Sequence, residues 1–360
     1  MPHSSPPSPE YRYGFVDDYS EGAHPQLLQT LIETNKTQQT GYGRDALCTL
    51  ARQRIQAHLG RDDVGVFFVP SGTSANAISI AACLRPHEAV IAASSAHIVT
   101  RETGAVEASG HKIIQVPPQD GKLTPQSIRR ALDDNWHFPH MAKPKLVSIS
   151  NATEIGTIYS RQELMAIKRL CEEEKLILFL DGARIGTALT SSKNDMTMRD
   201  ILELTDLFWI GGTKNGALLG EAVVVKDATL ATEFEFFVKQ HGSLLAKGRI
   251  MGAQFAELFN GDLYYDLARK ANGCAELLSQ GIVKAGFVLD AATETNQVFA
   301  VLPLDLIQRL KDHFNFYVWE QRGEGKAVVR LVTTWATELG QVNKFIQLVQ
   351  EWTIEKAKSA

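Results

Sequence analysis

The sequence predicts an α/β protein with a mainly parallel sheet, followed by a small α+β unit at the C-terminal end. Short apolar or β-branched runs alternate with helical patterns up to about residue 260, and a different texture follows. A parallel strand is buried on both faces, and the run 176–180 is almost wholly apolar, as such a strand requires. We therefore expect a disordered tail over 1–14, a large domain over 15–260 and a small domain over 261–360.

The apolar runs give the strands of the large domain one by one. We expect these strands at 64–69, 89–93, 112–116, 145–149, 176–180, 207–210 and 222–225. Helical patterns separate them, for example over 74–84 and over 161–174, where Leu164, Ile167 and Leu170 follow helical spacing. Strands that alternate with helices favour a parallel sheet with crossover helices.

The small domain begins with a long helical pattern, expected at about 263–285. Shorter elements follow it, with strands expected at 297–302, 316–319 and 328–332 and helices at 304–314 and 339–356. The order strand, helix, strand, strand, helix is typical of a small α+β domain.

Composition and charge exclude several classes of function. The formal net charge of −4 gives no electrostatic reason to expect a nucleic-acid partner. No stretch approaches the roughly 18 apolar residues of a membrane span. Residues 1–10 are rich in proline and serine and lack the apolar run of a secretory signal. We expect a cytoplasmic protein with a small-molecule partner.

The cysteines and histidines do not predict a metal site. No C-x-x-C spacing occurs, which fits a reducing compartment and argues against a zinc or dithiol motif. The four cysteines lie far apart, at Cys48, Cys83, Cys171 and Cys274. His137 and His140 are close in sequence but have no cysteine partner, so we expect no metal there.

A lysine among glycines follows the expected strand 207–210, in the segment Gly211-Gly212-Thr213-Lys214-Asn215-Gly216. Open α/β sheets bind ligands outside the carboxyl ends of their strands, and glycines let the backbone pass close to a flat cofactor. A desolvated lysine has a lowered pKa, so its amine is nucleophilic near neutral pH. Alone, the motif is also compatible with a lysine in a surface turn.

An aspartate ends the expected strand 176–180, in the segment Leu180-Asp181-Gly182-Ala183-Arg184. A carboxylate at that position can pair with the ring nitrogen of a cofactor and keep it protonated, which makes the ring an electron sink. The structural alternative is an aspartate that caps the next helix.

Two further motifs follow strands. Pro70-Ser71-Gly72-Thr73-Ser74-Ala75-Asn76 joins a strand to a helix, where backbone N–H groups and hydroxyls form a phosphate site. It is neither a Walker A loop nor a G-x-G-x-x-G motif, and a simple capped helix start is the alternative. His97 also follows a strand, where an imidazole can stack on a ring or exchange a proton. A lone histidine is otherwise more often structural.

Together the motifs read, in chain order, as a phosphate loop, a ring-stacking histidine, an acidic partner for a pyridine nitrogen and a Schiff-base lysine. Chance would produce all four motifs in this order far less often than any one of them. The sequence therefore predicts an enzyme that uses pyridoxal 5′-phosphate (PLP) and has the aspartate-aminotransferase-like fold, fold type I.

From about Phe15 to near the C-terminus, the chain resembles the threonine aldolase and β-eliminating lyase family of PLP enzymes. The matching motifs are Ser71-Gly72-Thr73-x-Ala75-Asn76, His97-Ile98-x-x-x-Glu102-x-Gly104-Ala105, Asp181-Gly182-Ala183-Arg184, Lys214, Arg330-Leu331-Val332-Thr333 and Tyr42-Gly43-x-Asp45. Within the family, the low-specificity L-threonine aldolases share features similar to Gly22-Ala23-His24-Pro25 and Thr153-Glu154-x-Gly156-Thr157.

The resemblance implies a role for each matching residue. Lys214 would hold the cofactor, Asp181 would pair with its ring nitrogen and His97 would stack on the ring. Cofactor contacts would also come from Ser71, Gly72, Thr73, Arg184 and Thr213. The substrate would be held by Arg184 and Arg330 at its carboxylate, which suits bidentate guanidinium groups, and by Tyr42 from a neighbouring subunit. Lys247 or Arg249 would add a cationic phosphate contact.

Two departures from the family pattern limit this transfer. The family often has Ser-Asp-Thr near the start, where this chain has Asp17-Asp18-Tyr19, so the usual serine contact to the substrate carboxylate does not carry over. Many relatives have a Thr-His pair where this chain has Ala152-Thr153, and no role of that second histidine transfers.

The implied reaction is retro-aldol cleavage of L-threonine, L-allo-threonine or another β-hydroxy-α-amino acid to glycine and an aldehyde. His97, Glu102 or a bound water is the base for the β-hydroxyl proton, and the sequence does not choose among them. Rival hypotheses are β-elimination or transamination on the same scaffold, and a non-catalytic binding protein, against which the intact Asp181 and Lys214 argue.

The resemblance also implies a homodimer or homotetramer with active sites at the dimer interface. It further implies a role in glycine biosynthesis and threonine catabolism.

Overall fold

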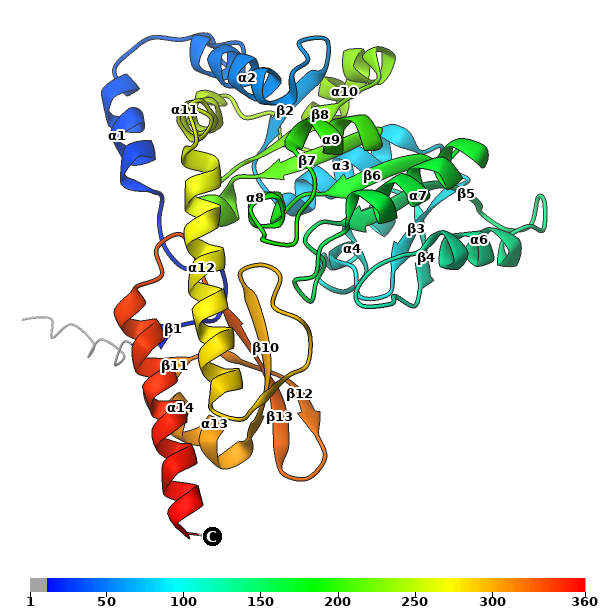
Figure 1. Ribbon diagram of the computed structural model, residues 1–360. Helices are drawn as coiled ribbons and strands as arrows, with labels where there is room; N and C mark the ends of the chain where they lie inside the picture. The colour runs from blue at the N-terminus through cyan, green and yellow to red at the C-terminus, as the bar shows by residue number, and fades with distance from the viewer. Residues whose placement is uncertain (1–11, 360) are drawn as a thin grey trace, which may run out of the picture.

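The computed structural model describes residues 12–359, in which a large α/β part and a smaller part are joined by the long helix α12 (Leu263–Lys284) (Figure 1). The central sheet has seven strands in the order β2-β8-β7-β6-β5-β3-β4. Their bounds are β2 (Gly65–Val69), β3 (Glu88–Ala93), β4 (Lys112–Val116), β5 (Lys143–Ser150), β6 (Ile177–Asp181), β7 (Leu207–Gly211) and β8 (Glu221–Val225).

The central sheet is parallel except at β8, which pairs antiparallel with both β2 and β7. The connection from β7 to β8 holds only the 3₁₀ turn Thr213–Asn215 and its flanks, and a parallel return would need a crossover of a dozen or more residues. The prediction of a mainly parallel sheet is therefore confirmed, with one strand reversed for this reason.

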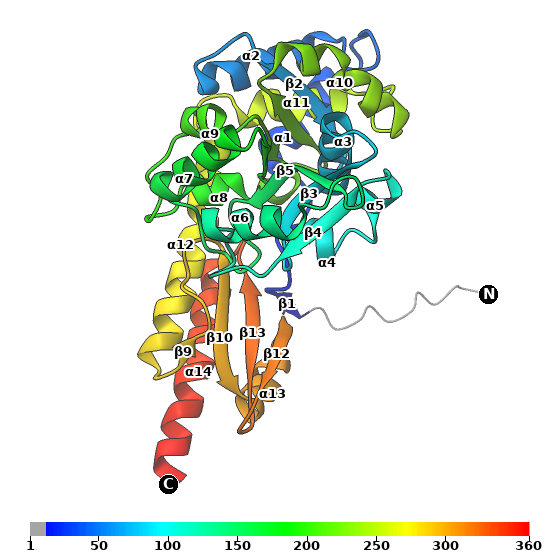
Figure 2. The same ribbon diagram turned by 90° about the vertical axis from the view of Figure 1, so that its right-hand side faces the viewer.

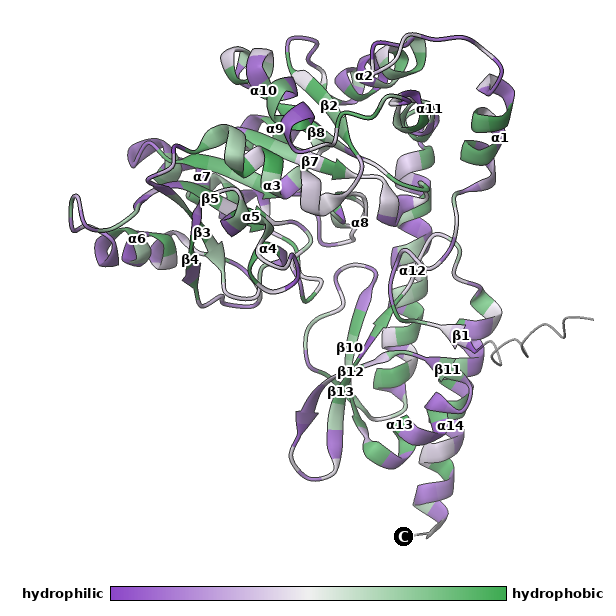
Figure 3. Cartoon of the chain, turned by 180° about the vertical axis from the view of Figure 1, so that it is seen from behind, coloured by the Kyte–Doolittle hydropathy of each residue, from purple (hydrophilic) through white to green (hydrophobic). Residues whose placement is uncertain are grey.

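The helices of the large part surround this sheet. They are α1 (Pro25–Thr34), α2 (Ala46–Leu59), α3 (Gly72–Cys83), α4 (His97–Thr100), α5 (Ala105–Ala108), α6 (Pro125–Asp134), α7 (Arg161–Glu173), α8 (Ile185–Leu189), α9 (Met198–Leu204), α10 (Ala228–Gln240) and α11 (Arg249–Leu258). Hydrophobic colours dominate the central strands, whereas outer helices such as α6 are mixed (Figure 3). This pattern fits strands buried on both faces.

The small part has a four-stranded antiparallel sheet in the order β12-β13-β10-β9. These strands lie beside α12 and the C-terminal helix (Figure 2). Its elements are β9 (Val288–Leu289), β10 (Gln297–Pro303), α13 (Leu304–Lys311), β11 (Phe314–Asn315), β12 (Tyr317–Arg322), β13 (Lys326–Val332) and α14 (Leu339–Ser359). The expected helix over 304–314 ends at Lys311 because residues 314 and 315 enter a strand.

Two hydrophobic cores meet along α12. Tyr264 and Leu267 pack in the core of the large part, whereas Cys274 and Leu278 pack in the core of the small part. One helix therefore contributes to both cores. The predicted boundary between residues 260 and 261 stays a prediction.

The first described residues differ from the expected tail. The strand β1 (Tyr13–Gly14) pairs in parallel with β11, and the fully buried Phe15 packs in the core of the small part. The expectation of disorder is wrong for residues 13 and 14, because a partner about 300 residues away in sequence orders them. The rest of the expected tail, residues 1–11, lies outside the described residues.

Over residues 12–359, no helix combines the length and the apolar character that crossing a membrane requires.

Candidate active site

A cleft of about 720 Å³ opens where strands of the central sheet end, and the small part closes one side of it. Most of the predicted site residues line this cleft, namely Ser71, Gly72, Thr73, His97, Asp181, Arg184, Thr213, Lys214 and Arg330. Residues from motifs that lie far apart in the sequence are therefore brought together, as the rule for parallel sheets predicts. The cleft is large enough for a cofactor and a small ligand.

A hydrogen-bond chain links the aspartate to the histidine. The side-chain amide of Asn76 donates to Oδ2 of Asp181 at 2.9 Å and to Oε1 of Glu102 at 2.7 Å. The same Glu102 oxygen lies 2.8 Å from Nδ1 of His97. Trp209 donates its indole N–H to Oδ1 of Asn76 at 2.9 Å, which fixes the orientation of the amide. The two carboxylates and the imidazole are therefore held as one unit.

Glu102 has a fully buried side chain, 0% exposed. Burial raises the pKa of Glu102, and the hydrogen bonds from His97 and Asn76 oppose that shift. Its second oxygen, Oε2, is buried without a hydrogen-bond partner among the described residues. A buried carboxyl group in contact with an imidazole can orient that imidazole and exchange a proton with it.

Glycines allow two neighbouring strand ends to approach each other closely. A Cβ at Gly182 would lie 1.8 Å from the carbonyl oxygen of Trp209, so no side chain fits there. A Cβ at Gly72 would lie 2.8 Å from the Trp209 ring, which therefore packs against the start of α3. The glycines beside the candidate residues are thus required by packing as well as by access to the cleft.

The candidate phosphate loop caps a long helix. Ser71 is the N-cap of α3, and its Oγ accepts a hydrogen bond from the backbone N–H of Ser74 at 3.2 Å. The first turn of this helix lies in the cleft, with Gly72 and Thr73 in its lining. Unpaired N–H groups at a helix N-terminus attract anions.

Lys214 lies in the 3₁₀ turn after β7, within the cleft. Burial lowers the pKa of its amine, and the nearby Arg184 guanidinium lowers it further. Beside it, the buried Glu221 accepts a hydrogen bond from the backbone N–H of Gly212 at 2.8 Å. Burial raises the pKa of Glu221 to about 7. A lysine with a lowered pKa is suited to nucleophilic chemistry.

Arg184 is held by an aspartate that the motifs did not single out. Asp18 accepts hydrogen bonds from Nε of Arg184 at 2.7 Å and from Nη2 at 3.0 Å, and also from the Asn296 amide at 3.0 Å. Burial alone would raise the pKa of Asp18, but the positive charges of Arg184 and Lys214 outweigh it and lower that pKa. Two donors of Arg184 are thus already used within the protein.

Arg330 enters the cleft from β13 of the small part. Gln297 on β10 accepts hydrogen bonds from its Nε at 3.0 Å and its Nη2 at 2.7 Å. Burial, and then the charge of Arg184, lower the pKa of Arg330. Its Nη1 makes no hydrogen bond to any described residue, so one edge of this guanidinium can bind a ligand.

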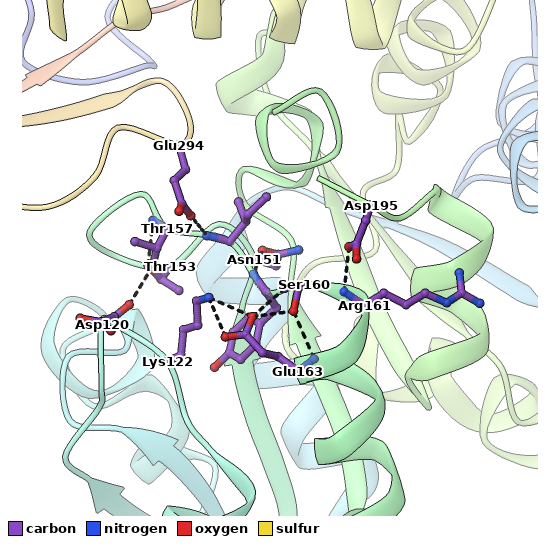
Figure 4. Close-up of polar contacts among 12 residues, drawn as sticks. Asp120, Lys122, Asn151, Thr153, Thr157, Ser160, Arg161, Glu163, Asp195 and Glu294 are labelled. Atoms are coloured by element: carbon purple, nitrogen blue, oxygen red, sulfur yellow. Dashed lines mark hydrogen bonds and ion pairs between the residues drawn. The ribbon is translucent and has the colours of Figure 1, made fainter. Parts of the chain in front are cut away.

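The segment between β5 and α7 is fixed by contacts on two sides (Figure 4). The Thr157 hydroxyl donates to the backbone carbonyl of Asp120 at 2.8 Å and lies 2.7 Å from Oγ1 of Thr153. From the small part, Glu294 accepts a hydrogen bond from the backbone N–H of Ile158 at 2.8 Å. This segment therefore joins the two parts of the molecule next to the cleft.

The contacts of this segment determine which residues in and beside the motif Thr153-Glu154-x-Gly156-Thr157 line the cleft. Thr153 is buried and bonded to Thr157, so it does not line the cleft, whereas its neighbours Ala152 and Glu154 do. Near the N-terminus, Tyr19 lines the cleft, while Asp17 accepts local hydrogen bonds from residues 19 and 20.

The remaining predicted residues lie away from the cleft of their own chain. Tyr42 is 46% exposed, and the Lys239 ammonium lies 4.7 Å from the centroid of its ring. Arg249 donates hydrogen bonds to the backbone carbonyls of Thr34 and Thr37. Lys247 and Arg249 do not line the cleft of this chain, so their roles, like the other residue roles, stay predictions.

The architecture is shared with solved structures of low sequence identity. An aspartate aminotransferase from Thermus thermophilus is 16% identical, with a TM-score of 0.68 over 94% of this chain and 91% of that chain. The chain therefore has fold type I, the aspartate-aminotransferase-like fold of PLP-dependent enzymes.

The family follows from closer matches. The Beta-eliminating lyase family matches residues 23–304. A low-specificity L-threonine aldolase from Pseudomonas aeruginosa is 34% identical over 92% of this chain and 95% of its own length. A solved threonine aldolase from Leishmania major is 42% identical, with a TM-score of 0.93, over 95% of this chain and 99% of that one. The chain belongs to the Beta-eliminating lyase family, whose members are PLP-dependent enzymes.

The residues present fit this cofactor. The cleft offers a lysine of lowered pKa, a buried carboxylate, and a helix N-terminus for the phosphate. The close approaches at Gly72 and Gly182 leave the backbone bare beside these groups.

Sequence reasoning missed several residues that hold the site together. Asn76 lay inside a quoted motif but received no role, and Asp18 was noted only as part of a departure from the family. Gln297, Trp209 and Glu221 gave no signal, because their partners Arg330, Asn76 and Gly212 lie on other elements of the fold.

Proposed function

We propose that this protein is a threonine aldolase, which cleaves L-threonine, L-allo-threonine and related β-hydroxy-α-amino acids to glycine and an aldehyde. The observation that carries the proposal is one cleft that combines Lys214 and Asp181 with a separate guanidinium, that of Arg330. Its relatives of similar length are named low-specificity L-threonine aldolases, which supports the same substrate class.

In this proposal the large part holds PLP. Lys214 would join it covalently, Asp181 would pair with its ring nitrogen and His97 would stack on its ring. Ser71, Gly72 and Thr73 would hold the phosphate, and Thr213 and Arg184 would add further contacts to the cofactor. When bound, PLP supplies the electron sink that accepts the electron pair of the broken Cα–Cβ bond.

The small part holds the substrate by its carboxylate. Nη1 of Arg330 is directed to this role because Gln297 already engages the other edge of the guanidinium. Arg184 adds its remaining nitrogen, since Asp18 uses Nε and Nη2. An acidic residue at position 17 would repel a carboxylate, so no contact from that position belongs to the proposal.

The base for the β-hydroxyl proton is the pair His97 and Glu102. Glu102 fixes the ring through Nδ1 at 2.8 Å, which leaves Nε2 of His97 to accept the proton. The rise in the pKa of Glu102 on burial lets this carboxyl group share the Nδ1 proton across the contact while Nε2 accepts the proton of the substrate. As the hydroxyl loses its proton, the β-carbon leaves as the aldehyde.

The test is to add L-threonine to the purified holoenzyme and to measure both possible product sets. We expect acetaldehyde and glycine in equal amounts, without 2-oxobutanoate or ammonia. 2-Oxobutanoate and ammonia would instead identify a β-eliminating enzyme, and a keto acid formed only with an amino acceptor would identify an aminotransferase. The absence of all products with retained PLP would indicate a binding protein.

The assembly and setting are also part of the proposal. A homodimer or homotetramer with Tyr42 reaching the neighbouring site is supported by exposed apolar residues on the α1–α2 side, Leu28, Ile32, Tyr42 and Leu50. A cytoplasmic location, in threonine catabolism and glycine biosynthesis, is supported by four free thiols. Sedimentation analysis should give two or four chains, and a monomer at assay concentration would contradict this assembly.

A further inference from the structure

A β-bulge interrupts β12 where it borders the cleft. Val318 pairs with Val329 and Glu320 pairs with Val328, so Trp319 is an extra residue without a partner in the ladder. In a regular strand, successive side chains point to opposite faces. Here three consecutive residues, Tyr317, Val318 and Trp319, all line the cleft. The ladder is therefore interrupted at Trp319, next to the cleft, where bulges commonly occur.

The Trp319 ring contacts charged groups from both parts of the molecule. The Arg330 guanidinium lies 5.4 Å from its centroid, and the Arg101 guanidinium lies 5.7 Å from it. Both distances are within the roughly 6 Å range of a cation–π contact. Phe299 packs against the same ring edge to face, with centroids 5.6 Å apart. Because Trp319 is 39% exposed, it forms part of the cleft wall and not of the core.

Arg101 ties this contact to the proposed base. It is the C-cap of α4, the short helix that begins at His97, and it lines the cleft. Trp319 therefore lies between the segment that carries His97 and the strand that carries Arg330. Arg184 adds a further positive charge near Arg330, so three guanidinium groups share one cleft and repel one another.

We propose that Trp319 is a positioning residue that holds Arg330 for the substrate carboxylate and, through Arg101, fixes the small part against the His97 segment. This inference rests on the proposed amino-acid substrate. The electron-rich ring face stabilises the partly buried Arg330 cation and keeps Nη1 directed into the cleft. Trp319 itself touches neither the cofactor nor the reacting atoms in this proposal.

The test measures glycine binding to the PLP-loaded enzyme by titration calorimetry and compares it with glycinamide, which lacks the carboxylate charge. Trp319→Ala should weaken glycine binding about tenfold, because a partly buried cation–π contact is worth about 1.4 kcal/mol. Glycinamide binding should change less than about twofold. Trp319→Phe retains a ring face and should recover most of the loss. For L-threonine cleavage, KM should rise and kcat should stay within about twofold.

A double-mutant cycle separates positioning from general structure. In an Arg330→Ala background, Trp319→Ala should have almost no further effect on glycine binding. The matched control is Trp136→Ala, an exposed tryptophan (74%) outside the cleft, which should change nothing. The proposal is overturned if Trp319→Ala leaves glycine binding intact, weakens glycine and glycinamide equally, or acts fully without Arg330.

A failure of the proposed aldolase activity can be distinguished from a failure of the proposed role of Trp319. In that case the wild-type enzyme would release no aldehyde from L-threonine, while the comparison of glycine with glycinamide would still report on Trp319. Thermal melting of each variant identifies any that fail to fold. If Trp319→Ala does, Trp319→Leu, which keeps apolar bulk without a ring face, supplies the measurement, and Trp319→Phe remains the rescue variant.

Discussion

The two halves of the cleft are built in different ways. On the large part, side chains from separate strand–helix units form one hydrogen-bond chain through Asp181, Asn76, Glu102 and His97. On the small part, Arg330 is held by one amide and one aromatic ring. The first half is cross-linked by short polar contacts that fix protons and charges. The second half is an arginine on a strand, so its position depends on how the small sheet meets the large one.

Removing Lys214 should have the largest effect, because it removes the covalent anchor of the first half. Lys214→Ala should lower L-threonine cleavage by roughly 10⁴-fold or more, the size found for residues that act as one unit. The visible absorption band of the bound cofactor should be lost or shifted. Lys112→Ala, at an exposed lysine of β4, is the control and should match the wild type. Retained activity in Lys214→Ala would contradict the proposal that Lys214 is the covalent anchor of the cofactor.

Asp18 tests how the two halves are joined, since it binds Arg184 of the large part and Asn296 of the small part. Asp18→Ala leaves a buried guanidinium unpaired and should lower the free energy of unfolding by about 3–5 kcal/mol. Denaturant titration measures this loss. Asp266→Ala breaks the exposed ion pair with Arg269 and should cost less than about 1 kcal/mol. Equal losses would mean that Asp18 does not join the halves.

The stability of the large part depends on pH through Glu221. Burial raises its pKa to about 7 from an ordinary 4.5, so the folded protein binds the proton more tightly than the unfolded chain. Stability from this group is therefore present below pH 4.5 and is lost as pH rises through 7. The loss is up to about 3 kcal/mol. Between pH 5 and pH 8, the melting temperature should fall less for Glu221→Gln than for the wild type. Equal falls in the two proteins would contradict this.

Asn76 tests the hydrogen-bond chain itself, with a smaller expected effect. Asn76→Ala removes a donor shared by two buried carboxylates and should cost about 1–3 kcal/mol. It should also shift the pH profile of cleavage, because His97 and Glu102 lose their neighbour. Ser79→Ala on the same helix is the matched control, since Ser79 Oγ is buried without a partner among the described residues. An equal shift of the pH profile in Asn76→Ala and Ser79→Ala would contradict a role for the hydrogen-bond chain through Asn76.

The contrast between the halves also explains what the sequence could predict. Asp181, Lys214, His97 and the Ser71 loop each follow a strand, and parallel strands bring such positions to one edge of a sheet. Local pattern and place along the chain were therefore enough to group them.

The rest depends on pairings that no local pattern contains. Asp18 meets Arg184 across 166 residues, and Tyr13–Gly14 meets a strand near residue 314. The apolar run 222–225 resembles the parallel strands, yet it runs antiparallel because of a short connection. A bulge at Trp319 likewise depends on how two strands align, not on the residues of one strand.

Helix α12 has a consequence for how this enzyme melts. Its 22 residues supply side chains to both cores, so neither core can come apart while the other keeps the whole helix intact. Heating should therefore give one calorimetric transition in place of two separate steps. A proline at Gly273, between the two sets of buried side chains, should break the helix and split that transition.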